Sequence, residues 1–125
     1  MRSSRRLHIL FVDDDESLLA PFTAMLERLG HTVTSRSQSL NGLRAFSDEP
    51  DEFDLAILDL DMPDLTGLEL GQRFRRIRPG FPVMVYSGPV DSSTRERIVA
   101  EGMDHVVLDP KTADQLEAAV RAALP

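Results

Sequence analysis

The sequence predicts an α/β fold in which helices cover both faces of a parallel β-sheet. Short apolar runs, typical of buried strands, alternate five times with helical patterns along the 125 residues. The connections are short, which favours parallel strands joined by crossover helices. Two of the runs, at residues 7–12 and 55–58, end on aspartates. These carboxylates should lie at the carboxyl edge of the sheet, where open α/β folds bind ligands.

Length and composition indicate one globular domain. Hydrophobic residues make up 42% of the chain, which is enough for a core and argues against disorder. The sequence has no apolar run near 18 residues and no signal-type cleavage site, so we expect a soluble, cytoplasmic protein with no membrane partner. The absence of cysteine excludes disulfides, thiolate metal sites and cysteine nucleophiles.

Charge also limits the partners. A formal net charge of −7 argues against direct binding of nucleic acid by this domain, because phosphate binding needs clustered Lys and Arg. Residues 1–6 form a short basic tail or linker with three arginines. A solvated linker is one interpretation of this tail, and a binding role is the alternative. The domain itself is expected to span residues 7–124.

The first half of the chain begins with the buried-strand pattern at residues 7–12. A helix is expected over 16–29, where apolar residues recur at helical spacing and Gly30 provides the stop. A short strand follows at 31–35. We expect its first residue, His31, to be a surface loop histidine, since no second ligand lies at metal spacing. The next helix, about 38–47, is weak because it contains Asn41-Gly42, although it has an apolar face.

The strand at residues 55–58 reads as buried on both faces, so Asp59 should emerge at its carboxyl end. In the turn that follows, Pro63 fixes its own φ, and Gly67 supplies flexibility before a helix over 68–78. A carboxylate placed in this way is held rigidly and faces solvent.

The second half continues the alternation. A strand over 81–86 delivers Ser87-Gly88 to the same edge, and a polar, marginal helix over 91–101 follows it. The last strand, 105–108, leads into Asp109-Pro110-Lys111, and an amphipathic helix over 113–124 ends the pattern.

The aspartates suggest a metal site. If the first and third strands lie side by side, Asp13, Asp14 and Asp59 meet at one edge, where their repulsion needs a cation to offset it. Hard oxygen ligands of this kind suit Mg²⁺. Two simpler readings stay open: Asp59 as an ordinary loop or capping aspartate, and Ser87 as a turn or cap serine.

The acidic pair followed by Leu-Asp-Leu-Asp-Met-Pro-Asp-Leu-Thr-Gly at residues 58–67 resembles the response regulator receiver domains of two-component signalling, including those of hybrid histidine kinases. The resemblance covers about residues 7–124. It implies a doubly wound (βα)5 flavodoxin-like fold with a five-stranded parallel sheet in the order 2-1-3-4-5.

The resemblance also implies a function, phosphoryl transfer from a sensor histidine kinase or phosphotransfer domain in a phosphorelay. Asp59 matches the phosphoacceptor, and Asp13 and Asp14 match the Mg²⁺-binding pair. The main-chain carbonyl of Asp61 would be a further ligand, and the Ser87 hydroxyl would bond the phosphoryl group. The domain would be a phosphoprotein with at most self-phosphorylation and autodephosphorylation chemistry. It would be either a stand-alone regulator or a module fused to an output or kinase domain.

The first departure from the family pattern is Asp109, which stands where receivers have a lysine that pairs with the phosphoryl group. A carboxylate about 4 Å from the phosphoryl would cost on the order of 4 kcal/mol at an effective dielectric near 20, before solvation reduces it. Lys111 offers a substitute if it folds back, and otherwise is simply solvated. The family also implies a cis peptide bond before Pro110.

The second departure is Val106, where receivers often have an aromatic residue that couples phosphorylation to the output surface. His105 should lie on the opposite face of its strand from Val106, and Tyr86 on the opposite face from Ser87. We therefore expect His105 and Tyr86 to be packing or rim residues, and Val106 argues against the usual Ser/aromatic switch of receivers.

Two other functions compete with the phosphoacceptor. A pseudo-receiver would keep Asp59 but act by protein contact without stable phosphorylation, and both Asp109 and Val106 favour it. A phosphatase is the enzyme alternative, because Asp59-Leu60-Asp61 resembles the Asp-x-Asp of haloacid-dehalogenase-like enzymes. That family has Thr or Val where this chain has Pro63, and its lysine motif is missing here.

Overall fold

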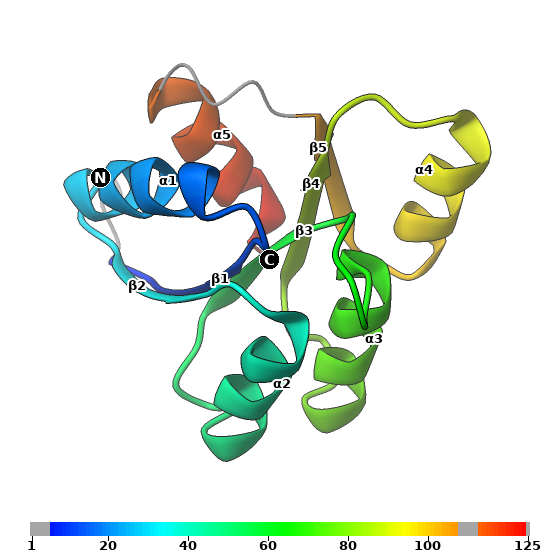
Figure 1. Cartoon of the computed structure of the whole chain (residues 1–125), viewed down its shortest axis with the longest axis horizontal. Helices are drawn as coiled ribbons and strands as arrows, with labels where there is room; N and C mark the ends of the chain where they lie inside the picture. The colour runs from blue at the N-terminus through cyan, green and yellow to red at the C-terminus, as the bar shows by residue number, and fades with distance from the viewer. Residues whose placement is uncertain (1–5, 108–112, 125) are drawn as a thin grey trace.

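A computed structural model of the chain describes residues 6–107 and 113–124. Five parallel strands form one sheet in the order β2-β1-β3-β4-β5 (Figure 1), so the expected fold class and strand order are confirmed. The strands are β1 (His8–Val12), β2 (Thr32–Arg36), β3 (Leu55–Asp59), β4 (Val83–Ser87) and β5 (Asp104–Val107).

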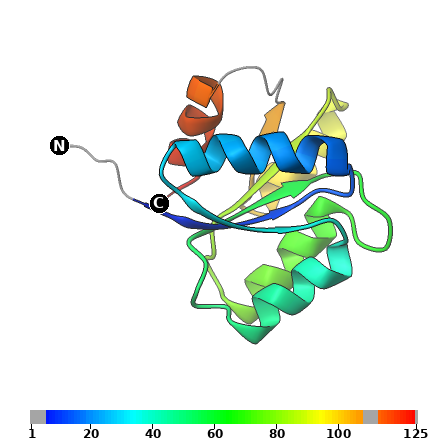
Figure 2. The same ribbon diagram turned by 60° about the vertical axis from the view of Figure 1, so that its left-hand side comes forward.

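Helices cover both faces of the sheet. They are α1 (Glu16–Arg28), α2 (Ser39–Asp48), α3 (Gly67–Ile77), α4 (Ser92–Ala100) and α5 (Ala113–Ala123). Figures 1 and 2 show α1 and α5 on one face and the other three helices on the opposite face. Every predicted element is present, with ends within two residues of the predicted ends. Within the described ranges, no helix is both long and apolar enough to cross a membrane.

Strand β1 lies inside the sheet because it is apolar on both faces. It pairs with β2 and with β3, and Val12 lies beside Leu58 in the second pairing. Leu10 and Val12 pack into the cluster under α2 and α3, while Ile9 and Phe11 pack into the cluster under α1 and α5. This alternation fixes the register, so the residues that follow Val12 and Leu58 emerge side by side at the carboxyl edge.

The glycine in α2 has a packing role. A Cβ on Gly42 would lie 2.7 Å from Cγ2 of Val12, so this helix can approach β1 closely only because residue 42 lacks a side chain. Asn41 and Gly42 give α2 a low helix propensity. Burial of its apolar face, which includes Phe46 at 0% exposure, offsets this loss.

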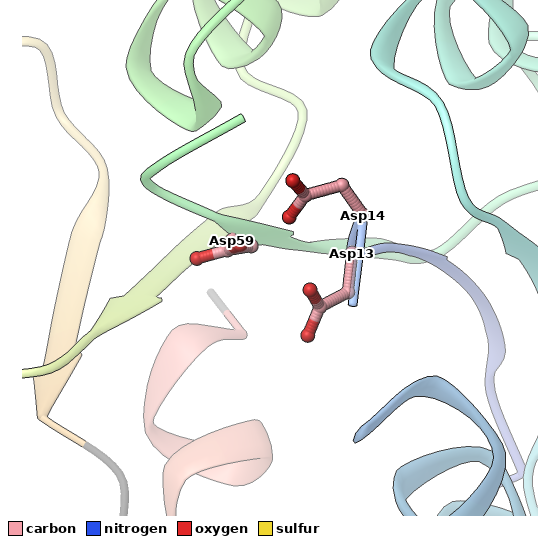
Figure 3. Close-up of side chains that lie close together, drawn as sticks. All are labelled: Asp13, Asp14 and Asp59. Carbon is pink, nitrogen blue, oxygen red and sulfur yellow. The ribbon is translucent and has the colours of Figure 1, made fainter. Parts of the chain in front are cut away.

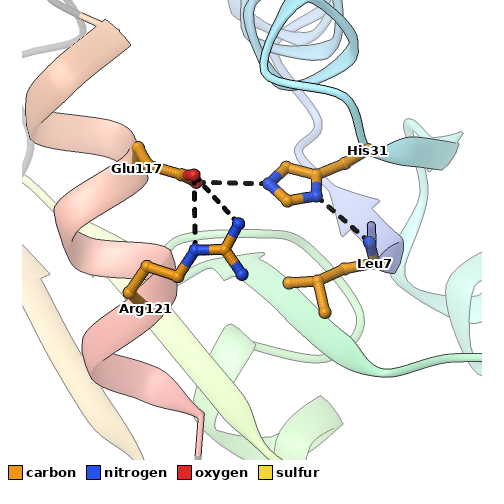
Figure 4. Close-up of polar contacts among 4 residues, drawn as sticks. All are labelled: Leu7, His31, Glu117 and Arg121. Atoms are coloured by element: carbon orange, nitrogen blue, oxygen red, sulfur yellow. Dashed lines mark hydrogen bonds and ion pairs between the residues drawn. The ribbon is translucent and has the colours of Figure 1, made fainter. Parts of the chain in front are cut away.

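The expectation that His31 is a surface histidine is wrong, because only 4% of it is exposed. Its Nδ1 accepts a hydrogen bond from the Leu7 amide at 3.2 Å, and its Nε2 lies 3.2 Å from Oε1 of Glu117 on α5 (Figure 4). Glu117 also accepts a bond from Arg121 at 3.0 Å. The ring thus joins Leu7, the residue before β1, to α5. Its contact with Glu117 links residues 86 positions apart, which local spacing could not reveal.

Replacing His31 with alanine should destabilise the fold. The change leaves a cavity and removes the acceptor for the buried Leu7 amide, so we expect a loss of about 2 to 3 kcal/mol in the free energy of unfolding. Urea denaturation measures this loss. Glu117→Gln, which keeps an amide oxygen as acceptor, is the control and should cost less than about 1 kcal/mol. A cost for His31→Ala below that of Glu117→Gln would contradict the structural role.

Candidate functional site

Three carboxylates meet at the carboxyl edge of the sheet, as the sequence predicts. Asp13 and Asp14 follow β1, and Asp59 ends β3 (Figure 3). Each offers a carboxylate oxygen, and these oxygens all lie within 4.8 Å of one another. Asp13 is buried, Asp59 is half-buried and Asp14 is exposed, so the cluster has one closed side and one side open to solvent. Among the described residues, no Lys or Arg forms an ion pair with any of the three.

The turn after β3 holds Asp59 through the backbone. The amide of Asp61 donates to Oδ1 of Asp59 at 3.3 Å. The amide of Leu60 donates to the carbonyl of Tyr86 at 3.0 Å, and the Gly67 amide donates to the carbonyl of Leu60 at 2.9 Å. The side chain of Asp61 is exposed beside the cluster. The turn therefore links the end of β3 to both β4 and the start of α3.

Gly67 is needed for a different reason from the one the sequence suggests. A Cβ at this position would collide with the backbone carbonyl of Asp59 and lie 3.1 Å from Cα of Leu60. Its φ is not in the left-handed region. The requirement is close approach rather than flexibility, because the first turn of α3 sits directly on the backbone of the carboxylate-bearing strand. The capping box of Thr66 and Glu69 fixes that turn.

A serine on α2 anchors the middle of this loop. The hydroxyl of Ser39, 2% exposed, donates to the carbonyl of Pro63 at 3.0 Å and accepts from the Leu65 amide at 3.2 Å. Between these two residues, Asp64 has a φ of 69°, a left-handed conformation that Asp tolerates better than most residues. The loop is thus held from both sides, which keeps the backbone near Asp59 in one arrangement.

Both carboxylate oxygens of Asp13 are hydrogen-bonded. The Asp15 amide donates to Oδ1 at 2.9 Å, and the hydroxyl of Tyr86 donates to Oδ2. Asp15 in turn caps α1 by accepting from the Ser17 amide at 3.0 Å. The alternation that places Tyr86 away from Ser87 is confirmed, since Tyr86 packs in the α1 and α5 cluster. Tyr86 is thus the packing residue that the sequence predicts, and its bond to Asp13 is a further role that the sequence did not indicate.

Ser87 ends β4 at the same edge, and its hydroxyl has two partners. It donates to the carbonyl of Gly88 at 2.6 Å, and it lies 2.8 Å from Nε2 of His105 on β5. Because the hydroxyl proton is directed to Gly88, the imidazole Nε2–H is the donor to Ser87. The other ring nitrogen, Nδ1, is a buried atom that has no hydrogen-bond partner among the described residues. His105 does lie on the opposite face from Val106, as predicted, and it is half-buried on the edge strand. This face is also that of Ser87, and the contact between the two side chains was not predicted.

Burial and like charge set the electrostatics of the site. Burial, followed by the charge of Asp13, raises the pKa of Asp59 from 3.8 to about 7. Burial and the bond to Asp13 raise the pKa of Tyr86, so its hydroxyl stays protonated. Burial and then the charge of Arg95 lower the pKa of His105, which favours the neutral ring. The cluster therefore contains a half-buried carboxylate, Asp59, and no described cationic side chain offsets its negative charge.

Two predicted site residues, Asp109 and Lys111, lie outside the described residues, as does the peptide bond before Pro110. Sequence reasoning missed the polar contacts of Ser39, Tyr86 and His105. Strand alternation indicates the faces on which Tyr86 and His105 lie. Alternation does not show which side chains the two residues will contact, because Tyr86 reaches Asp13, which follows a strand two positions away in the sheet.

The strand order and the three carboxylates at the carboxyl edge of the sheet define the class of protein: a flavodoxin-like α/β domain with clustered carboxylates after β1 and β3. Residues 9–121 match the family model of the response regulator receiver domain, so the chain belongs to that family.

Among curated relatives, the chain is similar to the transcriptional regulatory protein CseB of Streptomyces coelicolor, with 36% identity over 118 residues that cover 94% of this chain and 49% of that protein. It is 32% identical over 116 residues to KdpE of Mycobacterium tuberculosis, covering 93% and 50%. The chain thus spans about half the length of these relatives. A receiver domain structure from Clostridium thermocellum superposes with a TM-score of 0.85 at 30% identity, covering 93% of this chain and 92% of that one.

Proposed function

We propose that this receiver domain accepts a phosphoryl group on Asp59 from a phosphohistidine of a sensor kinase or phosphotransfer domain. The observation that carries the proposal is the cluster of Asp13, Asp14 and Asp59, whose oxygens lie within 4.8 Å at the carboxyl edge of the sheet. Such a cluster places a fixed carboxylate nucleophile beside a cation site, and position and charge neutralisation are what phosphoryl transfer requires.

In the proposed reaction, a carboxylate oxygen of Asp59 forms a bond to phosphorus as the bond from phosphorus to the donor nitrogen breaks. The products are an acyl phosphate and a free histidine. Hydrolysis by water later returns the carboxylate and inorganic phosphate. The chain contributes the rigid β3 turn that orients Asp59, through the Asp61 amide and the Gly67 contact. Ser87 lies on the next strand, where its hydroxyl would turn from Gly88 towards the phosphoryl oxygens.

The residues fit Mg²⁺ as the cofactor. All three side chains are hard oxygen donors, one side of the cluster is open to solvent, and no described basic side chain neutralises it. Asp14 and Asp59 would bind the ion directly with the main-chain carbonyl of Asp61, and Asp13 would act through water. When bound, Mg²⁺ supplies positive charge that offsets the carboxylates and the incoming phosphoryl oxygens.

The rival proposal is a pseudo-receiver that signals by protein contact without stable phosphorylation. One observation favours it: the sequence places Asp109, a negative charge, where the resemblance leads us to expect a lysine. At an effective dielectric near 20, this reversal would oppose the phosphoryl group by on the order of 4 kcal/mol before solvation and rotation reduce it.

Mass spectrometry of the intact protein separates the two proposals. After incubation with acetyl phosphate and Mg²⁺, we expect the wild type to gain about 80 Da, and Asp59→Asn to gain nothing. Omitting Mg²⁺ should abolish the adduct. Asp61→Asn, a neighbouring carboxylate that keeps its backbone amide, is the matched control and should still form the adduct.

Asp109→Lys supplies the second arm of this experiment. An adduct in Asp109→Lys but not in the wild type would mean that the charge reversal has removed the chemistry, and the pseudo-receiver would then be the better description. An adduct in both proteins supports the phosphoacceptor.

We also propose that residues 7–124 form the receiver unit and residues 1–6 a linker or tail. Support comes from the family match over residues 9–121. The relatives include multidomain proteins: the chain covers 15% of the sensor protein ArcB of Escherichia coli, for example. A fused output or kinase domain, a cytoplasmic location and a phosphorelay are consistent with these relatives.

A further inference from the structure

The hydroxyl of Tyr86 is the one side chain outside the acidic cluster, among the described residues, that is hydrogen-bonded to Asp13. Asp13 is 1% exposed, and its other oxygen already accepts from the Asp15 amide at 2.9 Å. Neither oxygen of Asp13 is therefore without a donor in the absence of a cation. Asp59, in contrast, accepts from the backbone only through the long 3.3 Å bond from the Asp61 amide, among the residues that the structure describes.

We propose that Tyr86 is a positioning residue of the cation site. This role of Tyr86 rests on the Mg²⁺ binding proposed above. Its hydroxyl occupies Oδ2 of Asp13 and so keeps Asp13 out of the inner coordination sphere. The same bond stabilises the cluster when no divalent cation is bound. Tyr86 thus lowers the affinity for Mg²⁺ in exchange for a stable cation-free state.

The charges of the cluster support this role. Three carboxylates with oxygens within 4.8 Å repel one another, and Asp13 is the one cut off from solvent. A buried carboxylate oxygen without a donor is costly, and a bond to a charged group is worth more than one between neutral groups. The tyrosine hydroxyl supplies this donor permanently. A cation that arrives later gains less from Asp13 than it would gain from an unbonded carboxylate.

The ring of Tyr86 is fixed, so the hydroxyl is not free to follow another partner. Tyr86 is 6% exposed. Its ring centroid lies 5.5 Å from that of Phe22 at an interplanar angle of 84° and 6.0 Å from that of Phe11. Its backbone carbonyl accepts from the Leu60 amide at 3.0 Å, in the turn that carries Asp59. Both ends of this residue therefore touch the site, from the face of the sheet under α1 and α5.

Tyr86→Phe tests the proposal because it removes only the hydroxyl and keeps the ring packing. In EDTA, the equilibrium constant for unfolding should rise about tenfold, since Oδ2 of Asp13 loses its buried donor. The dissociation constant for Mg²⁺, followed by backbone amide chemical shifts of Asp14 and Asp59, should fall about three- to tenfold. A residue that merely supported the fold would weaken both folding and binding, so tighter binding with lower stability distinguishes a positioning role.

Two comparisons complete the test. Phe22→Leu disturbs the same aromatic cluster but keeps the hydroxyl, so it should lower stability and leave the affinity for Mg²⁺ within about twofold. In an Asp13→Asn background, Tyr86→Phe should no longer change that affinity, because the partner carboxylate is gone.

Unchanged or weaker Mg²⁺ binding in Tyr86→Phe, while the wild type still binds the ion, would overturn the role of Tyr86 alone. The absence of saturable Mg²⁺ shifts in the wild type would overturn the metal site of the proposed function as well.

Discussion

Gly67→Ala should lower the free energy of unfolding by about 3 kcal/mol, a large effect for the addition of one methyl group. The new Cβ would overlap the backbone carbonyl of Asp59 and lie 3.1 Å from Cα of Leu60, and neither group can rotate away as a side chain would. The strand end and the first turn of α3 must separate, which displaces Asp59. Urea denaturation measures the loss, and the mass assay with acetyl phosphate should show less adduct.

Gly71→Ala is the matched control, because it lies four residues further along α3. There the Cβ would meet mainly the sulfur and terminal methyl of Met103, each at 2.8 Å, and this end of a flexible side chain can move. The gain in helix propensity, about 1 kcal/mol, opposes the crowding, so the net change should be within about 1 kcal/mol. Equal losses for the two variants would contradict a special role for the backbone contact at Gly67.

Asp59→Asn should stabilise the metal-free protein at neutral and alkaline pH. Asp59 titrates at 3.8 when its environment is ordinary and at about 7 in the fold, so the folded state holds the extra proton between these values. The contribution of the Asp59 carboxyl group to the free energy of unfolding is fully present below pH 3.8 and is lost as the pH rises through about 7. Because Asp59 is half exposed, solvent screening reduces the expected gain at pH 8 to about 2 kcal/mol.

Denaturation in EDTA at pH 5 and pH 8 measures this difference. The wild type should lose stability relative to Asp59→Asn over this range, and Mg²⁺ at ten times its dissociation constant should restore about 1.4 kcal/mol to the wild type. Asp61→Asn, at an exposed carboxylate two residues away, should change stability by less than about 0.5 kcal/mol. A pH dependence that persists unchanged in Asp59→Asn would show that another group causes it.

The sequence was sufficient for the fold because each element carries its own local pattern. The run at residues 55–58 is apolar on both faces, and the structure buries all four side chains in β3. An element with low helix propensity is stabilised by its neighbours: α2 forms despite Gly42 because its apolar face packs on β1. The meeting of Asp13, Asp14 and Asp59 also followed, since the ends of adjacent parallel strands coincide.

Other features could not be predicted, because they depend on contacts between distant segments. The burial of His31 depends on Glu117, which approaches only when α5 packs beside α1. The bond from Tyr86 to Asp13 spans two strand positions in the sheet and 73 residues of sequence. For Gly67, the sequence identified the residue but not the cause, because flexibility and close approach both call for glycine.

The hydroxyl of Ser87 has one proton, so it can donate to only one partner at a time. In the structure the proton goes to the carbonyl of Gly88, while the oxygen lone pairs receive the imidazole of His105 on β5. If Asp59 accepts a phosphoryl group as proposed, an anionic oxygen that took this proton would leave the carbonyl of Gly88 without its hydroxyl donor, while a lone pair of the Ser87 oxygen would still accept from His105. A change of charge at the centre of the sheet would thus act first on the segment that follows β4 and leads to α4.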